Sequence, residues 1–219
     1  MSSHSRFVGI SLLFVATVLC YFFRTAIFGE FASVSVVRDL TKALPIALLA
    51  IAVAWRSGRA NMIVAALALS SAGDVAGEHR AFLWQVGLFM AAHLCYIVAF
   101  WRERRGRNRT DITLSGAMWV VLICFAGVVI PHAATTAEQV AALLYVVVIG
   151  TMATTALCHR QPDRWIYCVA ALLFCSSDAM IGYARFVEPF PYRGLAVMIT
   201  YFAAQYLFAM AALRAKPTR

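Results

Sequence analysis

Residues 82–101 read FLWQVGLFMAAHLCYIVAFW, a run of 20 residues without an acidic side chain, a lysine or an arginine. A helix that crosses a hydrocarbon core about 30 Å thick needs about 20 mostly apolar residues. The run therefore predicts a membrane-spanning helix. It carries one histidine, His93, near its middle.

The rest of the chain has the same character. Of its 219 residues, 63% are hydrophobic and 13% are charged, whereas a typical soluble domain carries about 25% charged residues. So few charges cannot cover the surface of a soluble protein of this size. We expect an all-α integral membrane protein in a single transmembrane domain, residues 1–219, located as a multi-pass protein in the cell membrane, or in an endomembrane if the source is eukaryotic.

Eight apolar windows follow one another, separated by short gaps that contain charged residues, proline or glycine. They predict eight transmembrane helices at about 7–23, 40–55, 61–77, 82–101, 112–130, 137–158, 165–183 and 194–213. Pro45 is expected in the first turn of the second helix, where its missing N–H is tolerated. With an even number of spans, both termini lie on the same side of the membrane.

Lysine and arginine are divided unequally between the two predicted sides. The side of the termini holds 13 of these 19 residues and the opposite side holds 6. Cytosolic loops carry an excess of Lys and Arg, so both termini are predicted to be cytosolic. The net charge of +9 is interpreted in the same way, and no nucleic-acid partner is expected. The six basic residues on the outer side are Arg24, Arg38, Lys42, Arg80, Arg185 and Arg193.

Two of the predicted helices share a motif. Residues 67–74 read LALSSAGD and residues 172–178 read LLFCSSD, and each Asp lies 13 residues after the predicted start of its helix. Four spans separate the two helices, so they run in the same direction. The pattern predicts a possible parallel repeat of two four-helix halves, a device known in membrane folds.

Ionisable and polar side chains inside the windows are the candidate functional residues, because a charge in the bilayer is costly and rarely accidental. Asp74 and Asp178 each lie about 20 Å from the cytosolic ends of their helices. His93 lies about 16 Å from the outer end of its helix, and Tyr201 and Gln205 lie about 10 and 16 Å from the outer end of theirs. This common depth predicts a shared polar cavity.

Structural roles remain open for the carboxylates. Asp74 could pair with Arg80 or Lys42 at a helix end. Asp178 could accept a hydrogen bond from Ser176 or Ser177. Gly73 is followed four residues later by a second glycine, a spacing that lets another helix approach closely. Such an approach would bury the Asp74 carboxylate in protein.

The other polar residues also have simpler interpretations. His93 and Tyr96 share a helix face, and His93 could serve only as a hydrogen-bond partner between helices. Tyr201 could belong to the aromatic belt at the membrane surface. Lys42 could extend along its helix end so that its charge reaches water.

No motif points to a metal or cofactor. The six cysteines lie in apolar runs and none forms a CxxC pair, which disfavours a disulfide framework or a zinc site. The HExxH and GxSxG motifs and a glycine-rich phosphate loop are absent from the sequence. We expect no metal and no cofactor.

Six segments in order along the chain resemble the YhhN-like lysoplasmalogenases, a family of polytopic membrane proteins of bacteria and animals. They are KALP at 42–45, SSAGD at 70–74, GLF at 87–89, HLCY at 93–96, LFCSSD at 173–178 and YFAAQY at 201–206. The resemblance implies eight spans, no cofactor and hydrolysis of the vinyl ether bond of lysoplasmalogens. The products would be a fatty aldehyde and glycerophosphoethanolamine or glycerophosphocholine.

The resemblance and the common depth together suggest roles. Hydrolysis of a vinyl ether needs a proton delivered to carbon, and a second carboxylate can stabilise the oxocarbenium ion that follows, as in glycosidases. Asp74, Asp178 and His93 are the candidate catalytic residues, and which Asp is the acid stays open. The candidate substrate-binding residues are Lys42, Tyr96, Ser177, Tyr201 and Gln205, with Lys42 placed to meet a lipid phosphate.

Three other functions compete with this interpretation. A proton-coupled transporter would suit parallel repeats with buried carboxylates. An intramembrane aspartyl protease also pairs two aspartates, but a Tyr-Asp dipeptide is absent from the sequence. A lipid-binding or scaffold protein would use the polar groups for packing alone. The expected partners are a lysophospholipid substrate and membrane lipid, and the oligomeric state stays open.

Overall fold

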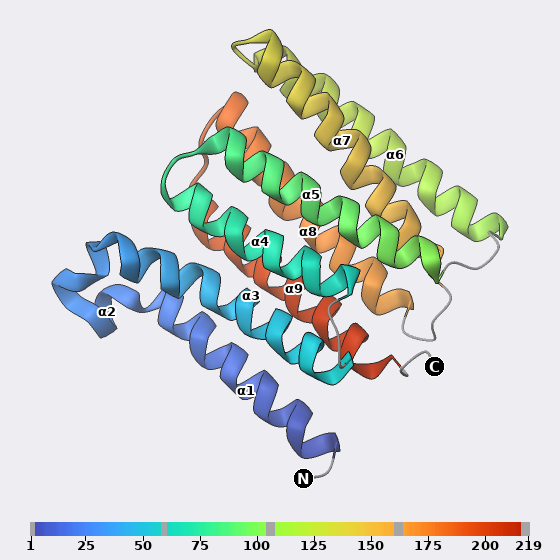
Figure 1. Cartoon of the computed structure of the whole chain (residues 1–219). Coiled ribbons are helices and arrows are strands. Elements are labelled where there is room, and N and C mark those ends of the chain that lie inside the picture. Colours follow the sequence, from blue (N-terminus) through green and yellow to red (C-terminus); the bar gives the residue numbers. More distant parts are fainter. Residues whose placement is uncertain (1–2, 58–60, 104–107, 160–163, 216–219) are drawn as a thin grey trace. The chain divides into compact units, whose positions relative to one another are not determined.

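The computed structural model describes residues 3–57, 61–103, 108–159 and 164–215, and its long elements are all helices. Eight have 17 to 23 residues: α1 (Ser3–Phe22), α3 (Ser35–Ser57), α4 (Met62–Glu78), α5 (Phe82–Arg102), α6 (Arg109–Val129), α7 (Thr136–Leu157), α8 (Arg164–Phe186) and α9 (Arg193–Arg214). The short helix α2 (Arg24–Phe28) and the 3-10 turns η1 (Gly29–Ser33) and η2 (Ile130–His132) lie between them (Figure 1). The all-α class is confirmed, and each predicted window overlaps one long helix.

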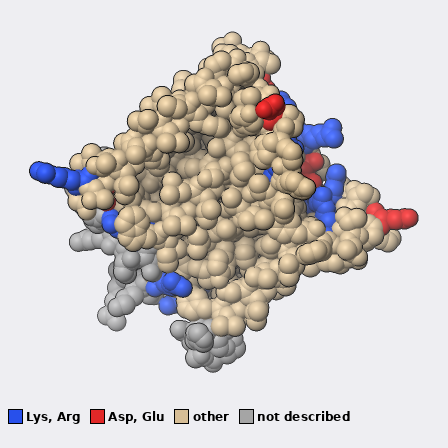
Figure 2. All heavy atoms as spheres, turned by 180° about the vertical axis from the view of Figure 1, so that it is seen from behind, with Lys and Arg blue, Asp and Glu red and all other residues tan. Residues whose placement is uncertain are grey.

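Five helices, α5 to α9, are long and apolar enough to cross a membrane. Helix α1 adds a sixth span if it is counted together with residues 24–33, from which a bend of 78° separates it. Helix α3 carries charges in its first turns, and α4 has 17 residues, a length of about 25 Å. The protein is therefore an all-α, multi-pass membrane protein. Uncharged residues cover most of the face in Figure 2.

The expectation for Pro45 was wrong, because Pro45 lies inside α3, which begins ten residues earlier at Ser35. The predicted window began only after the charged residues Arg38 and Asp39, but charged residues do not interrupt a helix, and α3 includes both. Pro45 is buried, and beside it Ser71 of α4 donates a hydrogen bond to the carbonyl of Ala43 at 3.0 Å.

The chain divides into two compact units, Met1–Ala92 (unit 1) and His93–Thr218 (unit 2), and the division falls within α5. In unit 1, α3 packs against α1 and α4 (Figure 1). The buried face of α3 presents Ile46, Leu49 and Val53, which are spaced as one side of a helix. Ala66 and Leu67 of α4 are fully buried as well.

In unit 2, α8 packs along α9 and α7, and α7 packs against α6. The core is aromatic: Tyr96, Phe100, Tyr167, Phe174 and Phe208 are buried. Gly150 of α7 permits the close approach of α6, because a Cβ at this position would lie 2.7 Å from the Trp119 ring.

Polar side chains cap the starts of two helices on the predicted cytosolic side. Asn108 and Asp111 form a reciprocal capping box at the start of α6, and buried Asp111 also pairs with Arg164 of α8 at 3.1 Å. Asn61 caps the start of α4 with its side-chain oxygen, which accepts hydrogen bonds from the backbone N–H groups of Ile63 and Val64. Seven of the basic residues counted for this side lie outside the described residues: Arg59, Arg104, Arg105, Arg107, Arg160, Lys216 and Arg219.

Candidate functional site

Three helices of unit 2 bring together a histidine, a tyrosine and an aspartate. His93 lies on α5, Tyr145 on α7 and Asp178 on α8. The Tyr145 hydroxyl donates to Asp178 Oδ2 at 2.7 Å. His93 Nε2 lies 3.0 Å from the same carboxylate oxygen and 3.0 Å from the Tyr145 hydroxyl. We call these three residues the His–Asp–Tyr triangle.

The triangle is enclosed by protein. His93 is fully buried and Asp178 is 9% exposed, and the Phe174 ring lies with its centre 4.5 Å from that of His93. His93 Nδ1 is buried and has no hydrogen-bond partner among the described residues. When Nε2 donates its hydrogen to the carboxylate, the lone pair of Nδ1 is left to accept a proton. A carboxylate that orients an imidazole in this way is the arrangement of an oriented general base.

The structural alternative proposed for Asp178 was wrong. Neither serine before it donates to the carboxylate, because Ser176 donates to the carbonyl of Leu172 and Ser177 to that of Val197 on α9. Ser177, a predicted substrate-binding residue, thus ties α8 to α9 at 3.2 Å.

Two other predicted residues of unit 2 meet directly. The Tyr96 hydroxyl donates to Gln205 Oε1 at 2.7 Å, and both side chains are fully buried. The amide nitrogen of Gln205 has no hydrogen-bond partner within the described part of the chain. Tyr201 is buried, with its ring centre 5.6 Å from that of Phe174, so it belongs to the aromatic core that also covers His93.

Asp74 lies in unit 1, where it is 2% exposed. The glycine spacing acts as expected, because a Cβ at Gly73 would meet the Phe89 ring of α5 at 3.2 Å and a Cβ at Gly77 would meet the Gln85 side chain at 2.7 Å. The close approach of α5 to α4 therefore depends on these glycines. Because Asp74 and Asp178 belong to different units, the shared cavity stays a prediction.

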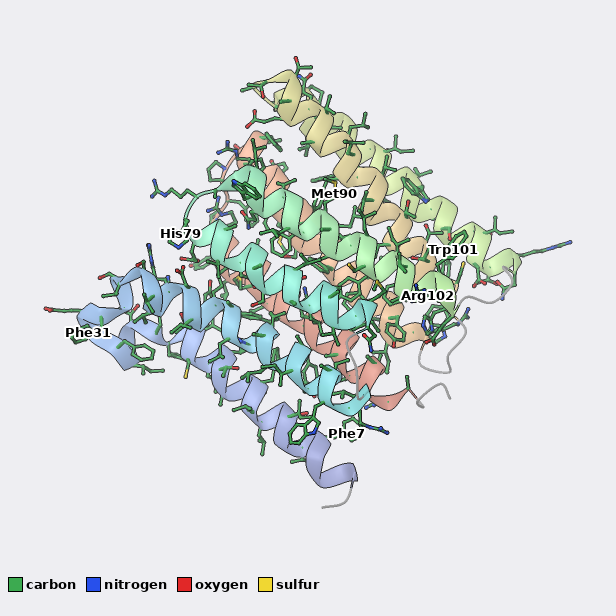
Figure 3. The ribbon with its side chains drawn as sticks, in the orientation of Figure 1. Phe7, Phe31, His79, Met90, Trp101 and Arg102 are labelled. Atoms are coloured by element: carbon green, nitrogen blue, oxygen red, sulfur yellow. The ribbon has the colours of Figure 1, made fainter. Side chains whose placement is uncertain are left out.

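Lys42 is engaged within unit 1. Its Nζ lies 3.3 Å from Glu78 Oε1 on α4, and both side chains are largely buried. Close by, His79 Nε2 lies 2.9 Å from Asp39 Oδ2. Figure 3 shows His79 at the C-terminal end of α4.

The sequence interpretation missed Tyr145 and Glu78. Tyr145 lies nine residues after the start of α7, a depth of about 14 Å, and the depth argument applied to Tyr201 would have selected it. Its position inside an apolar run made it look like a packing residue. Glu78 looked like a loop residue because it follows the apolar window, but α4 extends to include it.

No group of three or more His, Cys, Asp or Glu side chains in the described ranges is arranged to hold a metal ion.

Comparison with known proteins gives relatives over most of the chain. The sequence model of the YhhN family matches residues 37–212. The lysoplasmalogenase of Mycobacterium bovis is 31% identical over 175 residues, which cover 75% of this chain and 65% of that protein. Lysoplasmalogenase TMEM86B of Sus scrofa is 31% identical over 178 residues, covering 78% of this chain and 73% of that protein. The chain thus spans about two thirds of the length of the mycobacterial relative, and no solved structure gives a significant match.

Proposed function

The chain belongs to the YhhN family, and on this premise we propose that it is a hydrolase that cleaves the vinyl ether bond of lysoplasmalogens. The relatives named lysoplasmalogenase support the substrate class. The observation that carries the proposal within this chain is the His–Asp–Tyr triangle, because it provides an oriented base in a buried site.

The reaction consumes one water and involves no redox change. A proton adds to the vinyl carbon remote from the ether oxygen, and the carbon bonded to oxygen becomes part of an oxocarbenium ion. Water attacks that carbon and loses a proton, which gives a hemiacetal. The hemiacetal hydroxyl then loses its proton as the bond from the same carbon to the glycerol oxygen breaks, and the glycerol oxygen takes up a proton. The products are a fatty aldehyde and glycerophosphoethanolamine or glycerophosphocholine.

In this proposal, His93 accepts the proton of the attacking water at Nδ1. Asp178 holds the imidazole through Nε2, and Tyr145 holds Asp178 through its hydroxyl. The short contacts between these atoms support the assignment. Asp74 is the second carboxylate and the candidate donor of the proton to carbon, and its burial supports that role.

The remaining predicted residues line or position the substrate. Gln205 has a buried amide group that can donate to the ether or glycerol oxygens, with Tyr96 orienting it. Tyr201 contributes an aromatic wall, and Ser177 positions α8 through its bond to α9. Lys42 can bind the lipid phosphate only if its ion pair with Glu78 breaks.

We further propose that α3 and α4 cross the membrane as two additional spans, giving eight spans in two four-helix halves of a cell-membrane protein with cytosolic termini. The excess of Lys and Arg on the side of the termini supports this topology. Single cysteines placed at Ser57 and Arg80 in a cysteine-free variant test it. The topology requires a membrane-impermeant thiol reagent to label position 80, but not position 57, in intact cells.

The activity is tested by release of aldehyde from an alkenyl lysophospholipid by purified protein in detergent. Asp74→Asn, Asp178→Asn and His93→Gln should each abolish release, while Glu138→Gln, which removes a carboxylate paired with Arg185 outside the triangle, should leave it unchanged. In deuterated water the aldehyde should carry one deuterium on the carbon beside the carbonyl. Full activity in both Asp variants would refute the two-carboxylate chemistry. No release by the parent protein across head groups and chain lengths would refute the hydrolase.

A further inference from the structure

Ser70 of α4 has a hydroxyl that the protein encloses but does not use. The side chain is fully buried, and its Oγ makes no hydrogen bond to any residue that the structure describes. Serine and threonine inside a helix can donate to the carbonyl one turn earlier, as Ser11 and Thr41 do here at 2.9 and 2.7 Å. Ser70 does not, so a buried polar group has lost its hydration without a protein partner to replace it.

The position of Ser70 on α4 places it beside Asp74. Residues four apart in a helix share a face, with their Cβ atoms about 5–6 Å apart. To one side of this pair, Ser71 donates to a backbone carbonyl of α3 at 3.0 Å. To the other side, Gly73 lies close to α5. With 3.6 residues per turn, Ser70 and Asp74 lie between these two contacts, in the middle of the buried face of α4.

A substrate that reaches Asp74 also comes within reach of Ser70. Asp74 is the candidate donor of the proton to the vinyl carbon, and Ser70 lies one helical turn away. The ether oxygen gains positive charge as this carbon is protonated, so a hydrogen bond donated to it at that step would oppose the reaction. The next oxygen along the glycerol backbone is the free hydroxyl on the middle carbon. A serine hydroxyl both donates and accepts hydrogen bonds, which matches an alcohol.

We propose that Ser70 hydrogen-bonds the free hydroxyl on the middle glycerol carbon of a lysophospholipid and thereby selects lysolipids over lipids with two chains. In a two-chain lipid an ester replaces this hydroxyl, so no O–H remains to donate to Ser70. A site that hydrogen-bonds a substrate hydroxyl disfavours an analogue that lacks it, because a buried group of the protein is then left unpaired. The inference rests on the proposed function, because it takes the position of the substrate from the role of Asp74.

A second buried serine provides the matched control. Ser115 of α6 also has an Oγ without a hydrogen-bond partner in the described ranges, and it too lies four residues from a buried aspartate, Asp111. Asp111, however, pairs with Arg164 at 3.1 Å and has no role in the proposed reaction. Ser115→Ala therefore removes the same kind of group from a place where no substrate is expected.

Binding of two lipids that the hydrolase cannot cleave tests the inference. One is a saturated alkyl lysophosphatidylethanolamine, whose ether bond has no vinyl group, and the other is its analogue with hydrogen in place of the middle hydroxyl. Affinities for the parent, Ser70→Ala and Ser115→Ala are measured in detergent by ligand titration of the thermal midpoint and checked by native mass spectrometry. Alanine is the better helix former, and Ser70 gives up no hydrogen bond within the described chain, so Ser70→Ala should not lower the midpoint of the free protein.

We expect the parent to bind the lysolipid about three- to tenfold more tightly than the analogue without the hydroxyl, as one neutral hydrogen bond provides. Ser70→Ala should bind the two lipids within about twofold of each other, whereas Ser115→Ala should keep the preference of the parent. A Ser70 hydroxyl that served only Asp74 would leave the preference between the lipids unchanged. With vinyl ether versions of the two lipids, kcat/KM should show the same preference and the same dependence on Ser70.

The inference is overturned by a parent that binds neither lipid, by a parent without a preference, or by a Ser70→Ala variant that keeps the preference. If Ser70→Ala does not fold, Ser70→Cys replaces it, because a thiol is of similar size and donates only weakly; a full preference in that variant overturns the inference as well. Preference that depends on Ser70 without aldehyde release refutes the hydrolase alone. Aldehyde release with a preference independent of Ser70 refutes this inference alone.

Discussion

Replacement of Tyr145 by phenylalanine tests the contribution of the tyrosine hydroxyl to the His–Asp–Tyr triangle. It removes the hydroxyl that donates to Asp178 Oδ2 at 2.7 Å and lies 3.0 Å from His93 Nε2, and it leaves the ring in place. A hydrogen bond to a charged group contributes about 1.5–3 kcal/mol. Because about 1.4 kcal/mol of barrier is tenfold in rate, we expect kcat to fall about 10- to 150-fold if the bond holds the base in its working position.

The assay follows aldehyde release through a coupled alcohol dehydrogenase and separates kcat from KM. Tyr183→Phe is the matched control, because Tyr183 donates to Glu188 outside the triangle at 3.1 Å, and we expect its kcat to match that of the parent. A purely structural role for Tyr145 predicts a lower thermal midpoint with normal kcat in the protein that stays folded. A kcat within about twofold of the parent would therefore refute the reasoning.

Three further predictions concern stability in detergent. Gly150→Ala should destabilise the protein by about 1–3 kcal/mol, because its Cβ would press on a rigid indole ring of α6; Gly116→Ala, with open space around it, should be neutral or stabilising, and equal midpoints would contradict the packing. Asp111→Asn should cost about 1.5–3 kcal/mol by weakening its bond to Arg164, and an unchanged urea midpoint would show that the ion pair contributes nothing. Burial lowers the pKa of His159 below its usual 6.5, partly offset by a nearby carboxylate. As the pH falls, His159 therefore takes up its proton in the unfolded chain before it does so in the folded protein. The contribution of the neutral imidazole to the free energy of unfolding is complete above about pH 6.5 and is lost as the pH falls toward the lowered pKa. His159→Gln should flatten this decline of the thermal midpoint, and an equal decline in both proteins would argue against the assignment.

The positions of the helices could be predicted because apolar windows and short charged gaps follow directly from the thickness of the bilayer. The start of α3 was misplaced because apolarity reports membrane depth and not helix propensity, so the window began well after Ser35. For the same reason α2 and η1 were not predicted, since such a short segment has neither the length nor the apolarity of a span.

Part of the site could also be predicted. Depth along the helices singled out His93 and Asp178, and they meet at 3.0 Å; it also singled out Gln205, which meets Tyr96, the helical neighbour of His93. Depth gives the position of a residue along its helix but not the direction in which its side chain points around the helix axis. The sequence therefore could not show that Tyr145, one of several tyrosines, faces the carboxylate of Asp178. Nor could it show that Lys42 would find a partner in Glu78, because the end of α4 depends on packing.

The contact between His93 Nε2 and Asp178 Oδ2 determines how many hydrogens the imidazole and the carboxylate share. A nitrogen and an oxygen 3.0 Å apart attract each other only with one hydrogen between them, because two facing lone pairs would repel. If that hydrogen moves from nitrogen to oxygen, the imidazole can hold another at Nδ1 and remain neutral. A proton gained at one edge of the ring would then be matched by one delivered at the other, so a base built on this pair would not need its ring to turn.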